Sequence, residues 1–335
     1  MKTPWYPLTF DPVYKDYLWG GTRIAEWYGR RATPSPCAES WECSSRPEGM
    51  SVVNAGRWRG RTLAELIQTE DRHGLLGAAG AHADFPLLLK IIDAKQCLSV
   101  QVHPDTTTAV TASGEPKTEA WYILAAEPGA SLYCGLTAGV TPEMLKRAAV
   151  GHDPEAMQRL LRRWPVTAGD VVFVPGGRVH AIGAGILLLE VQQNSDTTFR
   201  LYDWGRLGPD GKPRALHLDQ ALAVIDWQDA GDRYARVTPL KDVGPRPDVF
   251  QTRVTCRWFV LEQRRVTQAC DIQNDGTSFH AWFTVRGGLE FECSGGRTSV
   301  PAGTTVLMPA AIGRYRLQPS DAGRDTLAIR ITRPQ

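Results

Sequence analysis

Long hydrophobic segments are missing from this sequence. Its 335 residues are 42% hydrophobic, yet no apolar run approaches the roughly 18 to 20 residues that a membrane-spanning helix needs. The opening residues, MKTPWYPLTF, also lack the basic segment and the apolar stretch of a secretion signal. We therefore expect a globular, cytoplasmic protein without a membrane partner.

A charge excess of either sign is missing as well. Lys and Arg total 38 against 36 Asp and Glu, a formal net charge of only +2, so nothing in the balance favours a nucleic acid partner. The seven cysteines are odd in number and include no C-x-x-C pair, which favours reduced thiols over a disulfide framework. We expect a small-molecule substrate and a monomer or weak homo-oligomer.

Short strands dominate the predicted secondary structure. Apolar runs with period-2 alternation, bounded by Gly, Pro and Asp, recur along the chain, for example LSVQVH, AWYILAA, DVVFVP and ILLLEVQQ. The clearest helical pattern covers 141–163, where Thr-Pro at 141–142 and Asp-Pro at 153–154 each supply an N-cap followed by proline. These two starts predict two short helices, and shorter helices are expected within 61–76 and 216–228.

The stretch DVGPRPDV, residues 242–249, is rich in proline and glycine and precedes a fresh set of strands. A chain of this length can form two cores of ordinary size. We therefore predict an N-terminal catalytic domain at 1–241, with a helical insertion near 141–163, and a second domain at 242–335.

A weak internal repeat suggests that both domains share one architecture. AGDVVFVPGGRVHAI at 168–182 resembles AGTTVLMPAAIGRYRL at 302–317, and EAWYIL at 119–124 resembles HAWFTV at 280–285. Repeated short strands with tight turns predict a mainly β protein of two jelly-roll barrels, with a few short helices in and around the first. Chance similarity between two ordinary hairpins is the competing explanation.

The aligned positions of the repeat differ in chemistry. In the second copy, Arg314 stands where the first has His180, and His280 stands where the first has Glu119. We therefore expect a C-terminal domain of the same fold without a metal site.

Gln101 and His103 lie on one face of the strand LSVQVH, because alternate side chains of a strand share a face. A lone inward histidine is more often a hydrogen-bonded core residue than a ligand, so it needs partners. Glu119 starts the strand EAWYIL and His180 follows the turn PGGR, and neither suits an apolar core unless paired or metal-bound. Two nitrogen and two oxygen donors form a set that borderline divalent ions accept, and zinc is the first choice.

Three cations stand near these positions. Lys90 interrupts the apolar run LLLKII, Lys117 precedes Glu119 by two residues, and Arg200 lies in TTFRLYDW. Taken singly, each has an ordinary explanation, such as an alkyl stem that reaches a sheet edge. Together beside a metal they would form a pocket for an anionic substrate such as a phosphorylated metabolite.

Four motifs, in this order, resemble those of the type I mannose-6-phosphate isomerases, which are zinc-dependent cupins: LLLKIIDAKQCLSVQVHPD, GEPKTEAWYIL, GDVVFVPGGRVHAIG and LEVQQNSDTTFRLYDW. KDYLWGG and ESWECSSRPEG resemble the opening motifs of the same family, and the turn PGG replaces its more usual Pro-Ser/Ala-Gly. The likeness is to the short bacterial form. It implies a cupin fold and an isomerase that interconverts mannose 6-phosphate and fructose 6-phosphate through a cis-enediolate.

The resemblance also implies roles for individual residues. One Zn²⁺ per chain would be held by Gln101, His103, Glu119 and His180. Arg200 would be the catalytic arginine beside the developing oxyanion, and Asp196 would be the aspartate of the same motif. Beyond what the resemblance implies, we assign acid–base transfer to Lys117, and assistance in ring opening to Glu42 or Asp196. Substrate contacts are expected from Lys90, Ser44, Glu42 and Trp19, with the phosphate at Lys90 and Ser44.

Other functions are compatible with the same residues. A cupin dioxygenase would also use a His/Glu metal cluster, normally with iron and O₂, although an arginine and two lysines favour an anionic substrate. A sugar-phosphate-binding regulator would be expected to have lost metal donors that this sequence keeps. An isomerase of another, or of an unphosphorylated, sugar is the nearest alternative.

Overall fold

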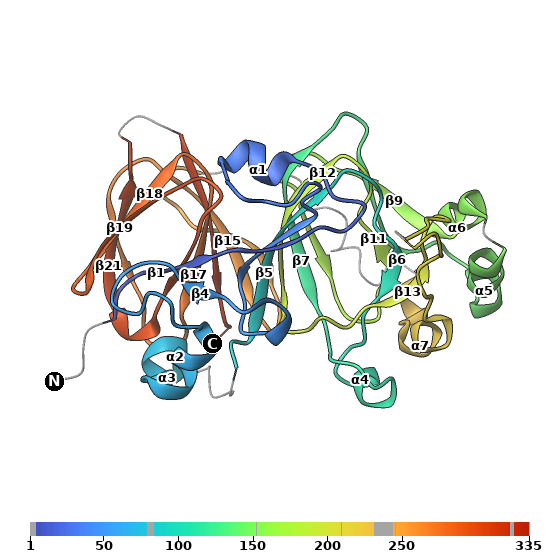
Figure 1. The fold of residues 1–335 in the computed structure, drawn as a ribbon, viewed down its shortest axis with the longest axis horizontal. Helices are drawn as coiled ribbons and strands as arrows, with labels where there is room; N and C mark the ends of the chain where they lie inside the picture. Colours follow the sequence, from blue (N-terminus) through green and yellow to red (C-terminus); the bar gives the residue numbers. More distant parts are fainter. Residues whose placement is uncertain are drawn as a thin grey trace.

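The computed structural model describes residues 5–78, 84–151, 153–208, 210–230, 244, 246–321 and 325–334. Strands dominate these residues and form four sheets. The sheets follow one another as layers along the long axis of the molecule, with the strands near the C-terminus (orange to red) at the left of the view and the green to yellow segments from the middle of the chain at the right (Figure 1).

Two sheets build the half of the molecule that carries the predicted metal donors. The six-stranded sheet has the order β10 (Val171–Val174), β7 (Glu119–Ala126), β12 (Ile186–Gln193), β5 (Leu87–Ala94), β3 (Glu39–Cys43) and β2 (Val13–Lys15). The five-stranded sheet has the order β13 (Phe199–Tyr202), β6 (Val100–Val102), β11 (His180–Ala181), β8 (Ser131–Leu136) and β9 (Leu161–Pro165).

Alternation along the strands places polar and apolar side chains in the space between these two sheets. In β7, Glu119, Trp121 and Ile123 share one face, because side chains two residues apart point the same way. Trp121 and Ile123 join Leu188 of β12 and Leu132 of β8 in one buried apolar cluster. The cluster fills one part of the interior, and polar residues of the same sheets line another part.

The remaining two sheets build the C-terminal half. The seven-stranded sheet has the order β14 (Gln251–Thr255), β15 (Val260–Val266), β22 (Thr326–Thr332), β17 (His280–Arg286), β20 (Thr305–Met308), β1 (Leu8–Asp11) and β4 (Val52–Val53). The four-stranded sheet has the order β16 (Cys270–Gln273), β21 (Arg314–Pro319), β18 (Gly288–Cys293) and β19 (Gly296–Pro301).

The six- and seven-stranded sheets share one hydrophobic core. Ile91 and Leu189 of the six-stranded sheet belong to the same buried cluster as Phe283 and Ile329 of the seven-stranded sheet. Burying a side chain of this size stabilises the fold by about 1.5–3 kcal/mol. Apolar packing therefore joins the two halves of the molecule over a whole sheet face.

Strand β1 corrects the predicted domain assignment. Leu8 of β1 pairs with Leu307 of β20, and β4 extends the same sheet on the other side of β1. Residues 8–11 and 52–53, predicted within the N-terminal domain, thus belong to the C-terminal sheet. Alternation predicts that a strand exists but not which edge it joins. The predicted boundary at 241/242 lies outside the described residues.

The helices are short: α1 (Arg23–Tyr28), α2 (Leu63–Thr69), α3 (Arg72–Leu76), α4 (Thr108–Thr111), α5 (Pro142–Val150), α6 (Pro154–Arg159) and α7 (Leu218–Val224). The two predicted helix starts are confirmed, since Thr141 caps α5 and Asp153 caps α6. The predicted range of 141–163 is too long, because residues 161–163 belong to strand β9. Residues of α5, α6 and α7 pack in one apolar cluster with the five-stranded sheet. No helix in the described ranges has the length and apolarity to cross a membrane.

Equivalent strand pairs occur in both halves, as the internal repeat predicts. Val174 of β10 pairs with Glu119 of β7, and Met308 of β20 pairs with His280 of β17. Both pairs are antiparallel and directly precede the proline of the repeated motif. The likeness between the two segments therefore reflects one shared arrangement and not two unrelated hairpins.

The predicted equivalence of Arg314 with His180 in the repeat is wrong. Arg314 does not point inward as His180 does: its side chain is 70% exposed and pairs with Asp271. The next residue, Tyr315, points inward instead, and its hydroxyl oxygen lies 2.7 Å from Nδ1 of His280. A buried histidine–tyrosine contact thus stands in the second copy.

Candidate metal centre and active site

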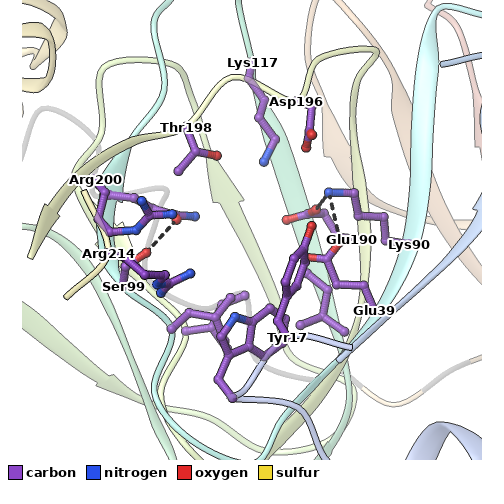
Figure 2. A pocket seen from close by; sticks show the side chains of 15 residues that line it. Tyr17, Glu39, Lys90, Ser99, Lys117, Glu190, Asp196, Thr198, Arg200 and Arg214 are labelled. Atoms are coloured by element: carbon purple, nitrogen blue, oxygen red, sulfur yellow. Dashed lines mark hydrogen bonds and ion pairs between the residues drawn. The ribbon is translucent and has the colours of Figure 1, made fainter. Parts of the chain in front are cut away.

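A cavity of about 290 Å³ opens in the polar part of the interior between the six- and five-stranded sheets (Figure 2). Strands and loops of both sheets line it with Tyr17, Trp19, Glu39, Lys90, Ile92, Leu98, Ser99, Gln101, Lys117, Ile182, Glu190, Asp196, Thr198, Arg200 and Arg214. The volume is close to that of small-ligand pockets. The predicted Lys90, Lys117, Asp196, Arg200 and Trp19 all reach this one space.

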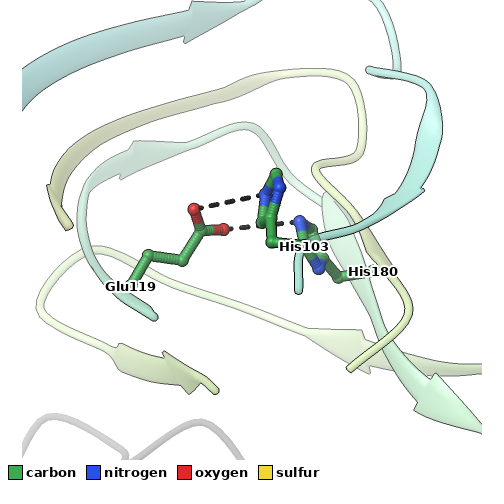
Figure 3. A group of neighbouring side chains, drawn as sticks. All are labelled: His103, Glu119 and His180. Atoms are coloured by element: carbon green, nitrogen blue, oxygen red, sulfur yellow. Dashed lines mark ion pairs between the residues drawn. The ribbon is translucent and has the colours of Figure 1, made fainter. Parts of the chain in front are cut away.

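The four predicted metal donors converge beside this cavity. Glu119 begins β7, His103 follows β6, and His180 begins β11 (Figure 3). His180 pairs with Gln101 of β6 across the five-stranded sheet, and the amide nitrogen of Gln101 lies 3.3 Å from Nε2 of His180. Three segments that are remote in the sequence therefore meet at one point.

The geometry directs acceptor atoms at one another. Oε1 of Glu119 lies 3.4 Å from Nε2 of His180, and Oε2 lies 3.5 Å from Nε2 of His103. Each histidine places Nδ1 against a backbone carbonyl oxygen, at 2.8 Å from Thr197 for His103 and 2.9 Å from Arg178 for His180. A carbonyl only accepts, so each Nδ1 carries the hydrogen and each Nε2 turns a lone pair toward the carboxylate.

Burial controls the protonation of this group, whose side chains are each 1% exposed. Desolvation lowers the pKa of His180 to about 3, and desolvation together with Lys117 lowers the pKa of His103 well below its ordinary range. Desolvation raises the pKa of Glu119 to about 7, against the opposing effect of Lys117. Oε1 of Glu119 has no hydrogen-bond partner among the described residues. Converging buried acceptors are unfavourable unless a cation joins them.

This donor set fits a divalent metal ion. A ligating histidine ordinarily donates its second ring N–H to a carbonyl or carboxylate, as both histidines do here. Two imidazole nitrogens, a carboxylate and the amide oxygen of Gln101, presented after a rotation of the amide, suit zinc and similar ions. Nζ of Lys117 lies 2.7 Å from Oε2 of Glu119 and 3.2 Å from Nε2 of His103, so a positive charge already stands beside these donors.

Lys90 projects into the cavity between two carboxylates. Its Nζ lies 3.5 Å from Oε2 of Glu39 and 3.6 Å from Oε2 of Glu190. The indole N–H groups of Trp41 and Trp121 donate to the same two carboxylates and hold them in place. Burial by itself would lower the pKa of Lys90, but the two acids raise it. This wall has a net negative charge, which suits hydroxyl groups better than an anion.

The opposite wall is cationic (Figure 2). Arg200 and Arg214 line it, and Arg214 is held by Asp203 through two hydrogen bonds of 2.7 and 2.6 Å. Arg206 binds the same carboxylate. Burial, Arg214 and Arg206 lower the pKa of Arg200, as expected where positive charge is in excess. An anionic group would find its countercharge at this wall.

Comparison with known proteins agrees with the motifs. Residues 8–126 match the family Phosphomannose isomerase type I, catalytic domain. Mannose-6-phosphate isomerase ManA of Bacillus subtilis (strain 168) is 36% identical over 317 residues, which span 93% of this chain and 96% of that protein. The chain belongs to the mannose-6-phosphate isomerase family. The resemblance predicted from the sequence is confirmed.

Two further relatives extend the comparison. The mannose-6-phosphate isomerase of Streptococcus mutans serotype c (strain ATCC 700610 / UA159) is 40% identical over 220 residues, 65% of this chain and 67% of that protein. The crystal structure of the mannose 6-phosphate isomerase from Bacillus subtilis superposes with a TM-score of 0.81 at 27% identity, over 98% of this chain and 99% of that one. The mannose-6-phosphate isomerase fold thus extends over both halves of the molecule.

Glu42 and Ser44, which the sequence predicts to contact the substrate, are not among the residues that line the cavity. The carboxylate of Glu42 accepts hydrogen bonds of 2.7 and 2.9 Å from the guanidinium of Arg30. Ser44 is fully buried, and its hydroxyl oxygen accepts from the backbone N–H of Arg46. Glu39 turns into the cavity, and Glu42 has the opposite parity on the same strand, so it faces the other side.

Sequence reasoning missed several residues that line this cavity, among them Glu39, Ser99, Glu190 and Arg214. Two of them carry a signal in the sequence. Glu190 interrupts the apolar run ILLLEVQQ as Lys90 interrupts LLLKII, and Ser99 shares a face with Gln101. Arg214 lies in a loop, where no periodicity reports which way a side chain points, so only the folded chain places it.

Proposed function

We propose that this protein is a metal-dependent aldose–ketose isomerase that interconverts mannose 6-phosphate and fructose 6-phosphate. The observation that carries the proposal is the buried group of two imidazole Nε2 atoms and one carboxylate beside a cavity with one cationic and one anionic wall. Family membership supports the same reaction, because the relatives that match over most of the chain carry the name mannose-6-phosphate isomerase.

One Zn²⁺ would be held by Gln101, His103, Glu119 and His180. Neutral imidazoles favour its binding, since they release no proton when a metal arrives. Bound at this place, zinc would act as a Lewis acid toward the C1 and C2 oxygens of the sugar without a redox change.

The two walls of the cavity give the substrate a direction. A phosphate is dianionic and would be attracted to the wall formed by Arg200 and Arg214. The sugar hydroxyls would meet the carboxylates of Glu39 and Glu190 on the opposite side. The sequence predicts Lys90 as a phosphate contact, but its charge is already compensated there by two acids. We therefore assign the phosphate to Arg214 and the hydroxyl groups to the Lys90 wall.

Isomerisation moves a proton between C1 and C2 through a cis-enediolate, so an acid–base group must reach both carbons. Lys117 enters the cavity beside Asp196 (Figure 2), and its Nζ lies 2.7 Å from Oε2 of Glu119. We assign this transfer to Lys117. Asp196 is exposed at the rim and would assist ring opening. Arg200 pairs with Gln101 across neighbouring strands, so its charge would stabilise the oxyanion as it forms.

The test is an assay of fructose 6-phosphate formation from mannose 6-phosphate by the full chain. The protein is stripped with a chelator, shown to be metal-free by elemental analysis, and assayed with and without added Zn²⁺. We expect turnover to vanish on stripping and to return with one equivalent of Zn²⁺. Mannose, which lacks the phosphate, should be a far poorer substrate.

Three variants assign the residues. Glu119→Ala and His180→Ala should remove both bound metal and turnover, whereas Arg200→Ala should lower kcat and keep the metal. Full turnover by protein shown to be metal-free would overturn the metal assignment. Equal turnover of mannose and mannose 6-phosphate would overturn the substrate.

A further inference from the structure

The loop between β10 and β11, residues 175–179, contacts both candidate histidine ligands through its backbone. The N–H of Gly177 donates to the carbonyl oxygen of His103 at 2.7 Å. The carbonyl oxygen of Arg178 accepts the Nδ1–H of His180 at 2.9 Å. The position of this loop therefore sets the orientation of one imidazole ring and the backbone that carries the other.

The same loop packs against the segment that carries the carboxylate donor. The N–H of Gly176 donates to the hydroxyl of Thr118, the neighbour of Glu119, at 3.3 Å. A Cβ at position 176 would lie 2.7 Å from the carbonyl oxygen of Pro104, which is a closer approach than a side chain permits. A small displacement of the loop would therefore move all three segments that carry the metal donors.

Asp229 holds this loop from outside the metal centre. Nε of Arg178 donates to Oδ2 of Asp229 at 2.8 Å, and Nη2 of Arg178 contacts Oδ1. Both side chains are buried, at 4% and 6% exposure. The loop carbonyl of Gly177 also accepts from the N–H of Asp226 at 2.8 Å. A bidentate salt bridge between a guanidinium and a carboxylate fixes the relative orientation of the two groups and also adds binding energy.

The segment that carries Asp229 is anchored at its other end to the catalytic arginine. Asp229 lies in a short 3₁₀ turn, Trp227–Ala230, which follows α7. At the start of α7, His217 donates its backbone N–H to the carbonyl oxygen of Arg200 at 2.8 Å, and its Nδ1 accepts from the N–H of Arg200 at 3.1 Å. Residues 217–230 therefore brace both the metal-centre loop and the cationic wall.

We propose that Asp229 is a positioning residue of the metal centre, which acts through Arg178 to hold the carbonyl that orients His180. The inference rests on the proposed metal-dependent function. Removing the charge of Asp229 weakens a buried ion pair with Arg178, and a weakened buried pair favours a shift of the loop. The carbonyl of Arg178 then no longer fixes the ring and the tautomer of His180.

The experiment compares Asp229→Asn with Glu262→Gln in the full chain. Oε2 of Glu262 accepts two hydrogen bonds, of 2.9 and 2.7 Å, from Arg330 in the seven-stranded sheet, so its variant loses another largely buried arginine–carboxylate ion pair, in a different sheet. The measurements are Zn²⁺ affinity by competition with a chromophoric chelator, the visible spectrum of the Co²⁺-substituted protein, and thermal unfolding in chelator.

We expect Asp229→Asn to weaken Zn²⁺ binding by about 10- to 100-fold, the usual effect of losing a group that orients a metal ligand. Its Co²⁺ spectrum should change, because the geometry of His180 changes. Glu262→Gln should lower the unfolding temperature and leave both metal readouts at their wild-type values. Arg178→Lys, which keeps the charge but not the two-bond contact, should weaken Zn²⁺ binding by a smaller factor.

Wild-type Zn²⁺ affinity and an unchanged Co²⁺ spectrum in folded Asp229→Asn would overturn the proposal, as would an equal loss of affinity in Glu262→Gln. Should Asp229→Asn fail to fold, Arg178→Lys decides, and wild-type affinity there would count against the proposal. A wild-type chain that binds Zn²⁺ but does not isomerise mannose 6-phosphate would refute the proposed function alone.

Discussion

Glu119→Gln should separate the stability cost of the metal centre from its function. Burial raises the pKa of Glu119 from an ordinary value of 4.5 to about 7. As pH rises, the carboxyl group of the unfolded chain therefore ionises before that of the folded chain. In chelator, the free energy of unfolding should fall between pH 4.5 and 7 and stay low above pH 7, with a total loss of about 3 kcal/mol.

Glutamine has the shape of glutamate without this penalty. Its amide N–H can donate to the unprotonated Nε2 of His103 or His180, which the carboxylate cannot do. The variant also loses the ion pair with Lys117, 2.7 Å away, which reduces the gain. We expect metal-free Glu119→Gln to be more stable than metal-free wild type at pH 8, by about 1 to 3 kcal/mol, and to bind Zn²⁺ much more weakly.

Urea unfolding in chelator at pH 8 and pH 5 measures this difference. At pH 5 the folded carboxyl group is almost fully protonated, so most of the penalty of burying its charge is relieved. The advantage of the variant should therefore shrink to about 1 kcal/mol or less. Glu190→Gln is the control of opposite sign: burial raises the pKa of Glu190, but Lys117 and Lys90 outweigh it and lower the pKa. That variant should be less stable than wild type. A metal-free Glu119→Gln that is less stable than wild type at pH 8 would refute the reasoning.

Three further predictions concern other parts of the molecule. Arg214→Ala should raise the KM for mannose 6-phosphate by about tenfold or more, since a charge-assisted hydrogen bond is worth about 1.5–3 kcal/mol; steady-state kinetics with an unchanged KM would contradict the phosphate assignment. Leu189 and Leu307 lie in the two sheets that form the shared core. Substituting either by alanine should lower the free energy of unfolding by about 2–5 kcal/mol, and urea should unfold each variant in one transition. Two separate urea transitions would argue against a shared core. Burial, with Arg330, lowers the pKa of His280 from 6.5 to about 3, so the unfolded chain takes up the proton first. The free energy of unfolding should therefore fall by at most about 1.4 kcal/mol per pH unit as pH drops from 6.5 to 3. In His280→Gln, measurements of unfolding against pH should no longer show this contribution.

Local residue patterns predict much of the site because its side chains obey strand parity. Gln101 lies on a strand whose other face is apolar, and Glu119 begins an apolar strand, so the sequence alone marks both as unusual. The turn before His180 is marked by its glycines. These signals are local, and a strand of alternating residues forms the same pattern in any fold that buries one of its faces.

The sequence misleads at loop residues and at strand residues whose side chains point away from the cavity. Glu42 and Ser44 stand in a conspicuous motif, yet they bind Arg30 and the backbone of Arg46 instead of lining the cavity. Arg214 reaches the cavity from a loop held by a carboxylate eleven residues earlier in the chain. Backbone hydrogen bonds repeat regularly in a strand but not in a loop, so no sequence period reveals where a loop side chain points.

The sequence by itself determined that the chain is mainly β and that two short capped helices interrupt it, and it singled out candidate metal donors, among them His103, Glu119 and His180, which the fold brings together. Only the tertiary structure decided that β1 joins the C-terminal sheet, that the two halves share one core, and that Asp229 lies behind the loop of His180. The reason is physical: parity and capping depend on residues a few positions apart, whereas sheet partners and buried ion pairs depend on which distant segments exclude water together.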